Sequence, residues 1–155
     1  MLDVLAQAEI SGTVMALDFG EQRIGVAVGN TLLCIAHPLQ TINTEVTERR
    51  FADIAALMRE WQPIMVLVGL PCYMDGREHE ISRLSRRFAR RLQGRLGIKV
   101  AMWDERLSSV AASQTLGEIG IKGQRQKSLL DQIAAQHILQ HYFDTPNNNA
   151  HLIWP

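Results

Sequence analysis

The chain has 155 residues, of which 46% are hydrophobic and 21% charged, and its 16 Lys and Arg balance its 16 Asp and Glu. This length and composition predict a single domain over residues 1–155 and exclude a disordered, fibrous or membrane-spanning chain. A net charge of zero also excludes a uniformly basic surface, so contacts with nucleic acid must depend on how the charges are distributed.

The N-terminal sequence MLDVLAQAEI contains no basic residue, and no apolar run reaches membrane-spanning length. We therefore expect a cytoplasmic protein that binds no membrane, with residues 1–12 as an N-terminal extension. Cys34 and Cys72 lie far apart, outside any paired-cysteine motif, which argues against a zinc knuckle, a dithiol site or a disulfide. We expect both thiols to be buried.

The first half of the chain begins with three predicted strands, at residues 13–19, 24–29 and 33–42, which form an antiparallel meander. Apolar residues at helical spacing then predict a helix from Thr44 to Trp61. The run IMVLVGL, residues 64–70, is typical of a strand that is buried on both faces of a parallel sheet.

The second half repeats this unit with a helix over residues 78–96 and a strand over 98–103. Helices near 107–117 and 128–143 follow, and residues 144–155 form a tail whose last apolar residues can dock back on the domain. The order predicts an α/β fold with a mixed five-stranded sheet, three antiparallel and then two parallel strands, flanked by helices. Ligands of such sheets bind at the carboxyl ends of the parallel strands.

Three acidic residues are expected near those strand ends. Asp18 ends the first strand, Glu105 follows the last one, and Asp131 opens the last long helix. Each also has a structural interpretation: Asp18 as a turn residue, Glu105 as a solvated partner of Arg106, and Asp131 as a capping box with Ser128.

The helical wheel favours a role at the sheet for Asp131, because it shares a face with Ala134 and Ala135, where the helix can approach closely. Converging carboxylates repel one another unless a cation lies between them. Oxygen ligands select Mg²⁺ or Mn²⁺, and two such ions about 3.5–4 Å apart can hydrolyse a phosphodiester. His137 and His141, one helical turn apart, are interpreted as structural residues rather than metal ligands.

Two basic segments are candidates for phosphate binding. The helix from residue 78 carries an arginine-rich arc with few acids, which indicates either phosphate contacts or a solvated surface. Its candidate residues are Arg83, Arg86, Arg87 and Arg90. The segment LGEIGIKGQRQKS, residues 116–128, is predicted to be a mobile basic loop that carries Lys122, Arg125 and Lys127. No aromatic run accompanies these charges, so backbone or shape recognition is favoured over base stacking.

The segments ALDFGEQRIGVAVG, HPLQTI, VGLPCYMDGRE, DERLSSVAA and KSLLDQIAAQHIL together resemble the YqgF/RuvX family, over nearly the whole chain from Thr13 to Phe143. The resemblance implies a ribonuclease H-like fold and a metal-dependent nuclease whose acidic residues fall on Asp18, Glu105 and Asp131. Asp104 is a reserve for Glu105, because strand alternation sends these neighbours to opposite sides. The sequence departs from the family pattern at two positions, Arg77 and His79.

From these observations we predict a metal-dependent endonuclease, a hydrolase of phosphodiester bonds with Mg²⁺ or Mn²⁺. The resemblance favours processing of the 5′ end of pre-16S rRNA, with resolution of Holliday junctions as the alternative. A non-catalytic nucleic-acid-binding or ribosome-assembly factor is a second alternative. A phosphotransferase of the actin type is disfavoured, because those enzymes need two such lobes. The expected partner is structured RNA or branched DNA; a resolvase is expected to be a homodimer, whereas an RNA nuclease can act as a monomer.

Overall fold

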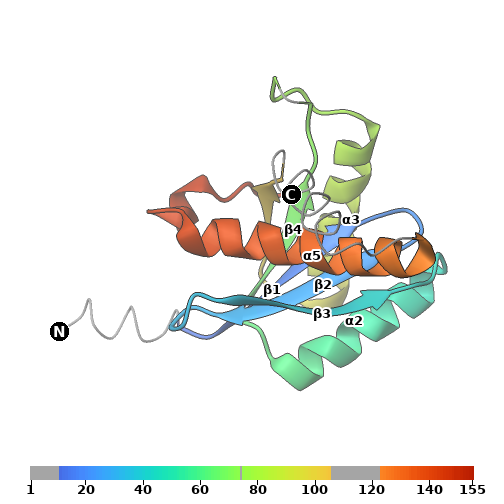
Figure 1. The fold of residues 1–155 in the computed structure, drawn as a ribbon, viewed down its shortest axis with the longest axis horizontal. Coiled ribbons are helices and arrows are strands. Elements are labelled where there is room, and N and C mark those ends of the chain that lie inside the picture. The colour runs from blue at the N-terminus through green and yellow to red at the C-terminus, as the bar shows by residue number, and fades with distance from the viewer. Residues whose placement is uncertain (1–10, 74, 106–122) are drawn as a thin grey trace.

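The computed structural model describes residues 11–73, 75–105 and 123–155, and it places a central sheet between helices (Figure 1). The strands are β1 (Thr13–Phe19), β2 (Ile24–Asn30), β3 (Ala36–Ile42), β4 (Met65–Leu70) and β5 (Val100–Asp104). The helices are α2 (Thr47–Trp61), α3 (Glu80–Leu96) and α5 (Gly123–Asp144), followed by a 3₁₀ turn, η1 (Asn148–His151). None of the helices in these ranges combines the length and the apolar character needed to cross a membrane.

The strand order is β3-β2-β1-β4-β5. β1, β2 and β3 pair antiparallel, whereas β1–β4 and β4–β5 are parallel pairs. This confirms the predicted mixed sheet of three antiparallel and two parallel strands. The third strand begins at Ala36 rather than at residue 33, because the chain turns through Cys34 in the left-handed conformation (φ 54°).

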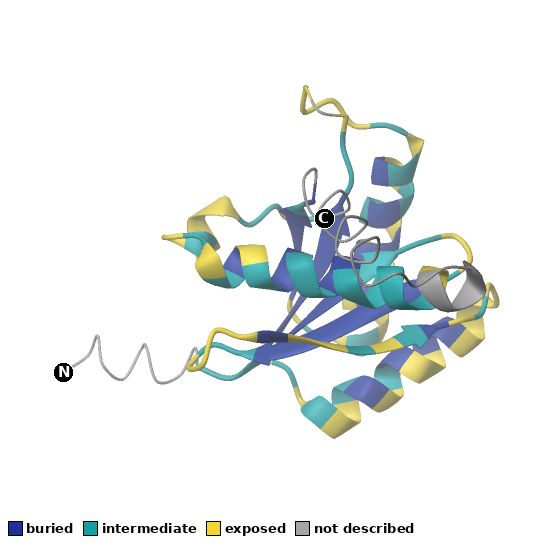
Figure 2. Ribbon diagram, viewed as in Figure 1, coloured by how far each residue is buried: buried dark blue, intermediate teal, exposed yellow. Residues whose placement is uncertain are grey.

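The alternation of side chains along the strands creates two apolar cores, one on each face of the sheet. Met15 and Leu17 of β1 pack with residues of α2 and α3, such as Ile54 and Phe88. On the other face, side chains from β1, β4 and β5 pack against α5, whose contributors include Ile138. Figure 2 shows the buried strands between the partly exposed helices. All six residues of β4 are buried, as expected for a strand that is covered on both faces.

The C-terminal tail docks on the sheet edge, as the sequence predicted. Ile153 forms an isolated antiparallel bridge with Met102, with two backbone hydrogen bonds of 2.6 and 3.0 Å. The expectation for the cysteines was wrong, because Cys34 is exposed in the turn between β2 and β3 and Cys72 is only partly buried.

Candidate active site

Asp18 lies at the end of β1 on the face of the sheet that α5 covers. Val14 and Ala16, four and two residues earlier, belong to the core under α5, and strand alternation places Asp18 on the same side. Its neighbour across the antiparallel pair is Gly25 of β2. The residue keeps some exposed surface, but its carboxyl group is desolvated. An ionisable group therefore stands at the end of an otherwise apolar strand.

Glu105, directly after β5, reaches the same place from the other side of β4. Its side chain is buried, with 7% of its surface exposed, and its N–H donates to the carbonyl of Leu70. Oε2 lies over Gly69 so closely that a Cβ on this glycine would collide with it. A side chain at position 69 would therefore fill the place that the Glu105 carboxylate occupies.

The sequence left open whether Asp104 or Glu105 faces the site. Trp103 packs under α5 and Met102 packs with α2 and α3, so strand alternation places Asp104 on the α2/α3 side. Glu105 lies on the α5 side, where an added Gly69 Cβ would meet both Glu105 and Ile138 of α5. Glu105 is therefore the neighbour of Asp18.

The carboxyl groups of Asp18 and Glu105 lie close enough for each to shift the pKa of the other. Burial raises the pKa of Asp18 from its ordinary value of 3.8 to about 7; the hydrogen bond with Glu105 opposes this rise, and the charge of Asp131 adds to it. Burial also raises the pKa of Glu105 well above its usual value, and the negative charge of Asp18 acts in the same direction. Glu105 Oε2 is buried and has no hydrogen-bond partner among the described residues.

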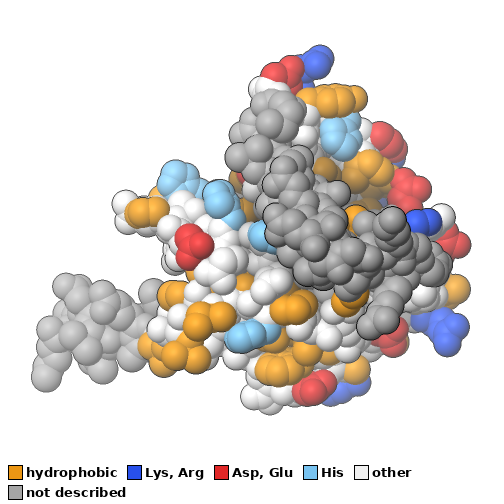
Figure 3. Space-filling view, in the orientation of Figure 1, with side chains coloured by type: hydrophobic (Ala, Val, Ile, Leu, Met, Phe, Trp, Pro, Cys, Tyr) orange, Lys and Arg blue, Asp and Glu red, His pale blue; other side chains and the backbone are white. Residues whose placement is uncertain are grey.

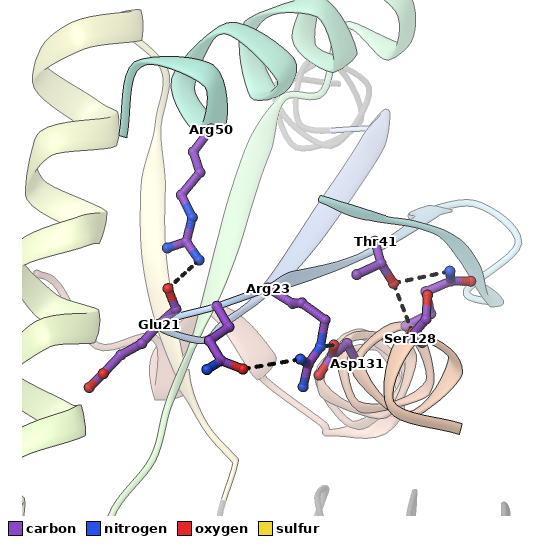
Figure 4. Close-up of polar contacts among 8 residues, drawn as sticks. Glu21, Arg23, Thr41, Arg50, Ser128 and Asp131 are labelled. Carbon is purple, nitrogen blue, oxygen red and sulfur yellow. Dashed lines mark hydrogen bonds and ion pairs between the residues drawn. The ribbon is translucent and has the colours of Figure 1, made fainter. Parts of the chain in front are cut away.

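Asp131 lies well inside α5, which begins at Gly123, so the predicted helix start near residue 128 was wrong. The alternative interpretation of Asp131 as part of a capping box with Ser128 is excluded for the same reason. The helix packs so closely on β2 that a Cβ on Gly25 would collide with the Asp131 carbonyl. The Asp131 carboxylate accepts a charge-assisted hydrogen bond from Arg23 Nε at 2.6 Å (Figure 4), and the two side chains are 19% and 21% exposed.

The structure thus joins two of the three predicted acids directly. Asp18 and Glu105 form a pair, whereas Asp131 lies near enough for its charge to raise the pKa of Asp18 but is bound to Arg23. Within the described ranges, no group of three or more His, Cys, Asp or Glu side chains is arranged to hold a metal ion as it stands.

Sequence reasoning gave Arg23 no role, although it lies within the segment that carries the family resemblance. Arg23 reaches from the end of the turn between β1 and β2 to α5, across 108 positions of sequence. The same turn is held on its other side by Arg50 of α2, whose Nη2 donates to the Glu21 carbonyl at 2.7 Å (Figure 4). A basic residue just after the turn that follows Asp18 was the available signal.

The arginine arc of α3 is more paired than the sequence indicated. Arg83 forms an ion pair with Glu80 at 2.5 Å, and Arg86 forms one with Glu78 at 2.6 Å. The prediction that acids are nearly absent from this surface was therefore wrong, because they come from the residues just before the arc. Arg87 and Arg90 are exposed, and neither forms an ion pair with another described residue.

The predicted basic loop was wrong over its last residues, because residues 123–128 form the first turns of α5. Arg125 and Lys127 belong to this helix, and Lys127 is exposed. Lys122 and the helix predicted at 107–117 lie outside the described residues.

The histidines of α5 have structural surroundings. His141 Nδ1 accepts a hydrogen bond from the indole of Trp103 at 2.8 Å. Burial lowers the pKa of His137. Both findings agree with the structural interpretation of this pair.

Solved structures of RuvC share the fold. The Thermus thermophilus RuvC structure aligns with a TM-score of 0.53 at 18% identity, covering 91% of this chain and 98% of that one. The complex of T. thermophilus RuvC with a Holliday junction substrate aligns with a TM-score of 0.52 at 19% identity, over 85% and 93% of the two chains. The class of fold is therefore ribonuclease H-like, with a pair of carboxyl groups at its strand ends.

Comparisons of sequence identify the family. The family model described as "RuvX: Holliday junction resolvase" matches residues 12–145, and the chain belongs to the RuvX family. A relative from Methylobacillus flagellatus is 60% identical over 137 residues, 88% of this chain and 94% of that protein. One from Nitrosomonas eutropha is 55% identical over 141 residues, 91% and 90% of the two chains. Both carry the name "Putative pre-16S rRNA nuclease", so the predicted family and its class, hydrolases that act on ester bonds, are confirmed.

Proposed function

We propose that the chain is a metal-dependent endonuclease whose reaction takes place at the Asp18–Glu105 pair. The observation that carries this proposal is the meeting of two desolvated carboxyl groups from β1 and the end of β5, one of them with a buried oxygen that has no hydrogen-bond partner among the described residues. Burial destabilises the charged form of a carboxyl group and raises its pKa. Carboxyl groups with pKa values shifted in this way are found preferentially at functional sites.

The residues at this position fit a hard divalent cation. Every candidate ligand is a carboxylate oxygen, which suits Mg²⁺ or Mn²⁺ better than zinc. Burial is the main cause that raises the pKa of both groups, and the charge of a neighbouring acid adds to it, Asp131 for Asp18 and Asp18 for Glu105. A cation bound here would favour the ionised form of both groups. Bound ions of this type activate water and stabilise the leaving oxygen of a phosphodiester, most often as a pair.

The chain's own residues divide the remaining tasks. Asp18 and Glu105 would hold the cation, and Asp131 of α5 would be the third candidate ligand. Arg23 fixes the orientation of the Asp131 carboxylate through its hydrogen bond at 2.6 Å. Lys127 stands four residues before Asp131 on α5, and therefore one turn away on the same face, where it can hold a backbone phosphate.

We assign further phosphate contacts to the exposed arginines of α3 that form no ion pair within the described part of the chain. Arg87 and Arg90 keep their guanidinium groups available, whereas Arg83 and Arg86 must first exchange their Glu80 and Glu78 partners. A guanidinium group binds phosphate through two parallel hydrogen bonds, which positions the nucleic acid without reading its sequence.

The substrate we propose is the 5′ region of pre-16S rRNA, because relatives that are 60% and 55% identical over most of their length bear the name of that nuclease. The family description supports a second candidate, the Holliday junction. The two substrates make different demands, since symmetric cleavage of a junction needs two copies of the chain.

The carboxylate assignment is tested with Asp18→Asn and Glu105→Gln in the presence of Mn²⁺. We expect both variants to lose cleavage by at least about a hundredfold while they still bind the substrate. Asp104→Asn is the matched control, because it removes an adjacent carboxylate from the opposite side of the sheet, and it is expected to cleave normally. Cleavage by Asp18→Asn at the wild-type rate would contradict the assignment.

The substrate is tested by offering a pre-16S rRNA fragment and a four-way DNA junction to the same preparation. Cleavage of the RNA by a monomer supports the rRNA nuclease, and paired incisions in the junction by a dimer support the resolvase. Tight binding of either substrate without cleavage in Mg²⁺ and Mn²⁺ would instead indicate a non-catalytic assembly factor.

A further inference from the structure

A tight hairpin follows β4 and stands clear of the sheet at the top of Figure 1. Its two sides meet at an isolated antiparallel bridge between Cys72 and Glu78. Within it, the Tyr73 N–H donates to the Arg77 carbonyl at 2.8 Å. The turn passes through Gly76 at a φ of 91°, a conformation that favours glycine. The hairpin is thus a defined element rather than an open loop.

Arg77 lies over the ring of Tyr73 and the tilted ring of His79 packs beside it; these three side chains are called the stack below. The Tyr73 residue is 52% exposed, and the Arg77 guanidinium carbon lies 5.2 Å from the centroid of its ring. The His79 ring lies 4.8 Å from the Tyr73 ring at an interplanar angle of 58°. Asp75 fixes the guanidinium group by an ion pair of 2.6 Å with Arg77 Nε. Acidic and basic side chains lie next to each other at the top of Figure 3, with hydrophobic and histidine side chains just below them.

The stack is anchored at the start of α3. His79 is the N-cap of this helix, and its Nδ1 accepts from the Ile81 N–H at 3.3 Å. The buried Ser82 hydroxyl accepts from the His79 N–H at 2.9 Å and donates to the Pro71 carbonyl. These bonds hold both ends of the hairpin, so a ligand that adds to the stack meets side chains that are already positioned.

The hairpin leaves the sheet beside the carboxylate pair. Gly69, over which the Glu105 carboxylate lies, is only four residues before Tyr73. Four residues of extended chain span at most about 14 Å. A nucleic-acid strand that lies across Asp18 and Glu105 therefore passes within a few nucleotides of this stack.

We propose that Tyr73, Arg77 and His79 form a stacking site for one unpaired nucleobase of the strand that is cleaved, an inference that rests on the proposed nuclease function. Aromatic rings and guanidinium planes stack on the face of any base, and they distinguish unpaired from paired nucleotides. The Arg77 side chain is 75% exposed, so its guanidinium group can receive the base and extend the stack by one layer.

This site also gives a role to the two positions, Arg77 and His79, at which the sequence departs from the family pattern. Each lies beside Tyr73 in the stack, although neither position suggests an aromatic platform when it is considered alone. The sequence expectation that base stacking is not indicated was based on the helix and loop charges, which lie elsewhere in the chain.

The test measures binding in EDTA, where cleavage does not interfere, by the anisotropy of short labelled oligonucleotides. The probes are an unstructured RNA strand, the DNA strand of the same sequence, and the fully paired RNA duplex. We expect Tyr73→Ala to weaken binding of the single strands by about five- to hundredfold and to leave the duplex unchanged. Tyr73→Phe keeps the ring and is expected to bind as wild type.

Arg77→Ala is compared with Arg59→Ala, which removes another exposed arginine, from α2. Only the first is expected to reduce the quenching of a 2-aminopurine base placed in the strand. Equal affinity of Tyr73→Ala and wild type for single strands, or an equal loss on the duplex, would overturn the proposal. Equal melting temperatures of the variants and the wild type would show that a loss of binding does not reflect misfolding.

The two proposals can fail separately. Loss of cleavage in Asp18→Asn together with unchanged binding by Tyr73→Ala removes the stacking site and leaves the nuclease intact. Weakened single-strand binding by Tyr73→Ala together with full cleavage by Asp18→Asn supports the stacking site and contradicts the proposed carboxylate site. A preference for RNA or for DNA among the single strands identifies which nucleic acid the site serves.

Discussion

Replacing Asp18 by Asn is expected to stabilise the metal-free protein, although it should abolish cleavage. A pKa of about 7 in the folded state, against 3.8 in the unfolded chain, means that folding favours the protonated over the ionised Asp18 carboxyl group by about 4 kcal/mol. Asn has nearly the same shape, is always neutral, and can donate a hydrogen bond to Glu105. Because Glu105 titrates with Asp18, part of this energy is shared, and we expect a gain of about 2–4 kcal/mol at about pH 8.

The sign of the effect follows from proton binding. Between pH 3.8 and about 7 the folded state binds a proton at Asp18 that the unfolded state has released. Wild-type stability therefore falls as the pH rises through this window and loses this contribution completely above it. The advantage of Asp18→Asn is small near pH 4 and reaches its full size above pH 7. For a chain of this length it corresponds to a rise in Tm of about 5–15 °C.

Urea unfolding in EDTA, followed by far-UV circular dichroism at about pH 5 and pH 8, measures this difference. Asp53→Asn is the matched control, since it removes an exposed aspartate from α2 and is expected to change little. An equal effect of Asp18→Asn at both pH values would show that the carboxyl group is not desolvated in the folded state. A destabilised variant at about pH 8 would refute the reasoning as a whole.

Three further predictions follow from the same geometry. Gly25→Ala places a Cβ against the backbone carbonyl of Asp131 in α5, and it should lower the free energy of unfolding by at least about 2 kcal/mol. Gly94→Ala, at an open position of α3, should raise the free energy of unfolding by about 0.5–1 kcal/mol. Calorimetry checks both values. Mn²⁺ should raise the Tm of the wild type at about pH 8 but not that of Asp18→Asn, a difference that thermal melts with and without EDTA detect. Glutamate at both Arg87 and Arg90 should weaken substrate binding and flatten its dependence on salt; an unchanged salt slope would show that these arginines do not contact phosphate.

Much of the fold could be predicted because its signals are local. The period of apolar residues identified all five strands and both helices under the sheet, and the chain order implied the mixed topology. Alternation of side chains also implied that Asp104 and Glu105 face opposite sides. Which of them faces α5 required the position of Trp103 between the sheet and that helix, and this depends on packing.

The errors at the site concern contacts between distant segments. Arg23 and Asp131 are 108 residues apart, and the sequence around either residue does not indicate that the other is its partner. The ion pair of Arg95 in α3 with Glu48 in α2 is equally non-local. The start of α5 was misplaced because glycine and polar residues around Gly123 are typical of a loop, whereas tertiary packing can extend a helix through such residues.

The stability of the site and its proposed chemistry are linked by the same charges. Asp131 has its own partner in Arg23, whereas no ion pair with a described cation compensates Asp18 and Glu105, so their ionisation opposes folding. A ligand that binds the ionised pair recovers this free energy as part of its affinity. Replacing both acids by amides would therefore produce a more stable fold that binds cations weakly, as expected when residues are retained for function at a cost in stability.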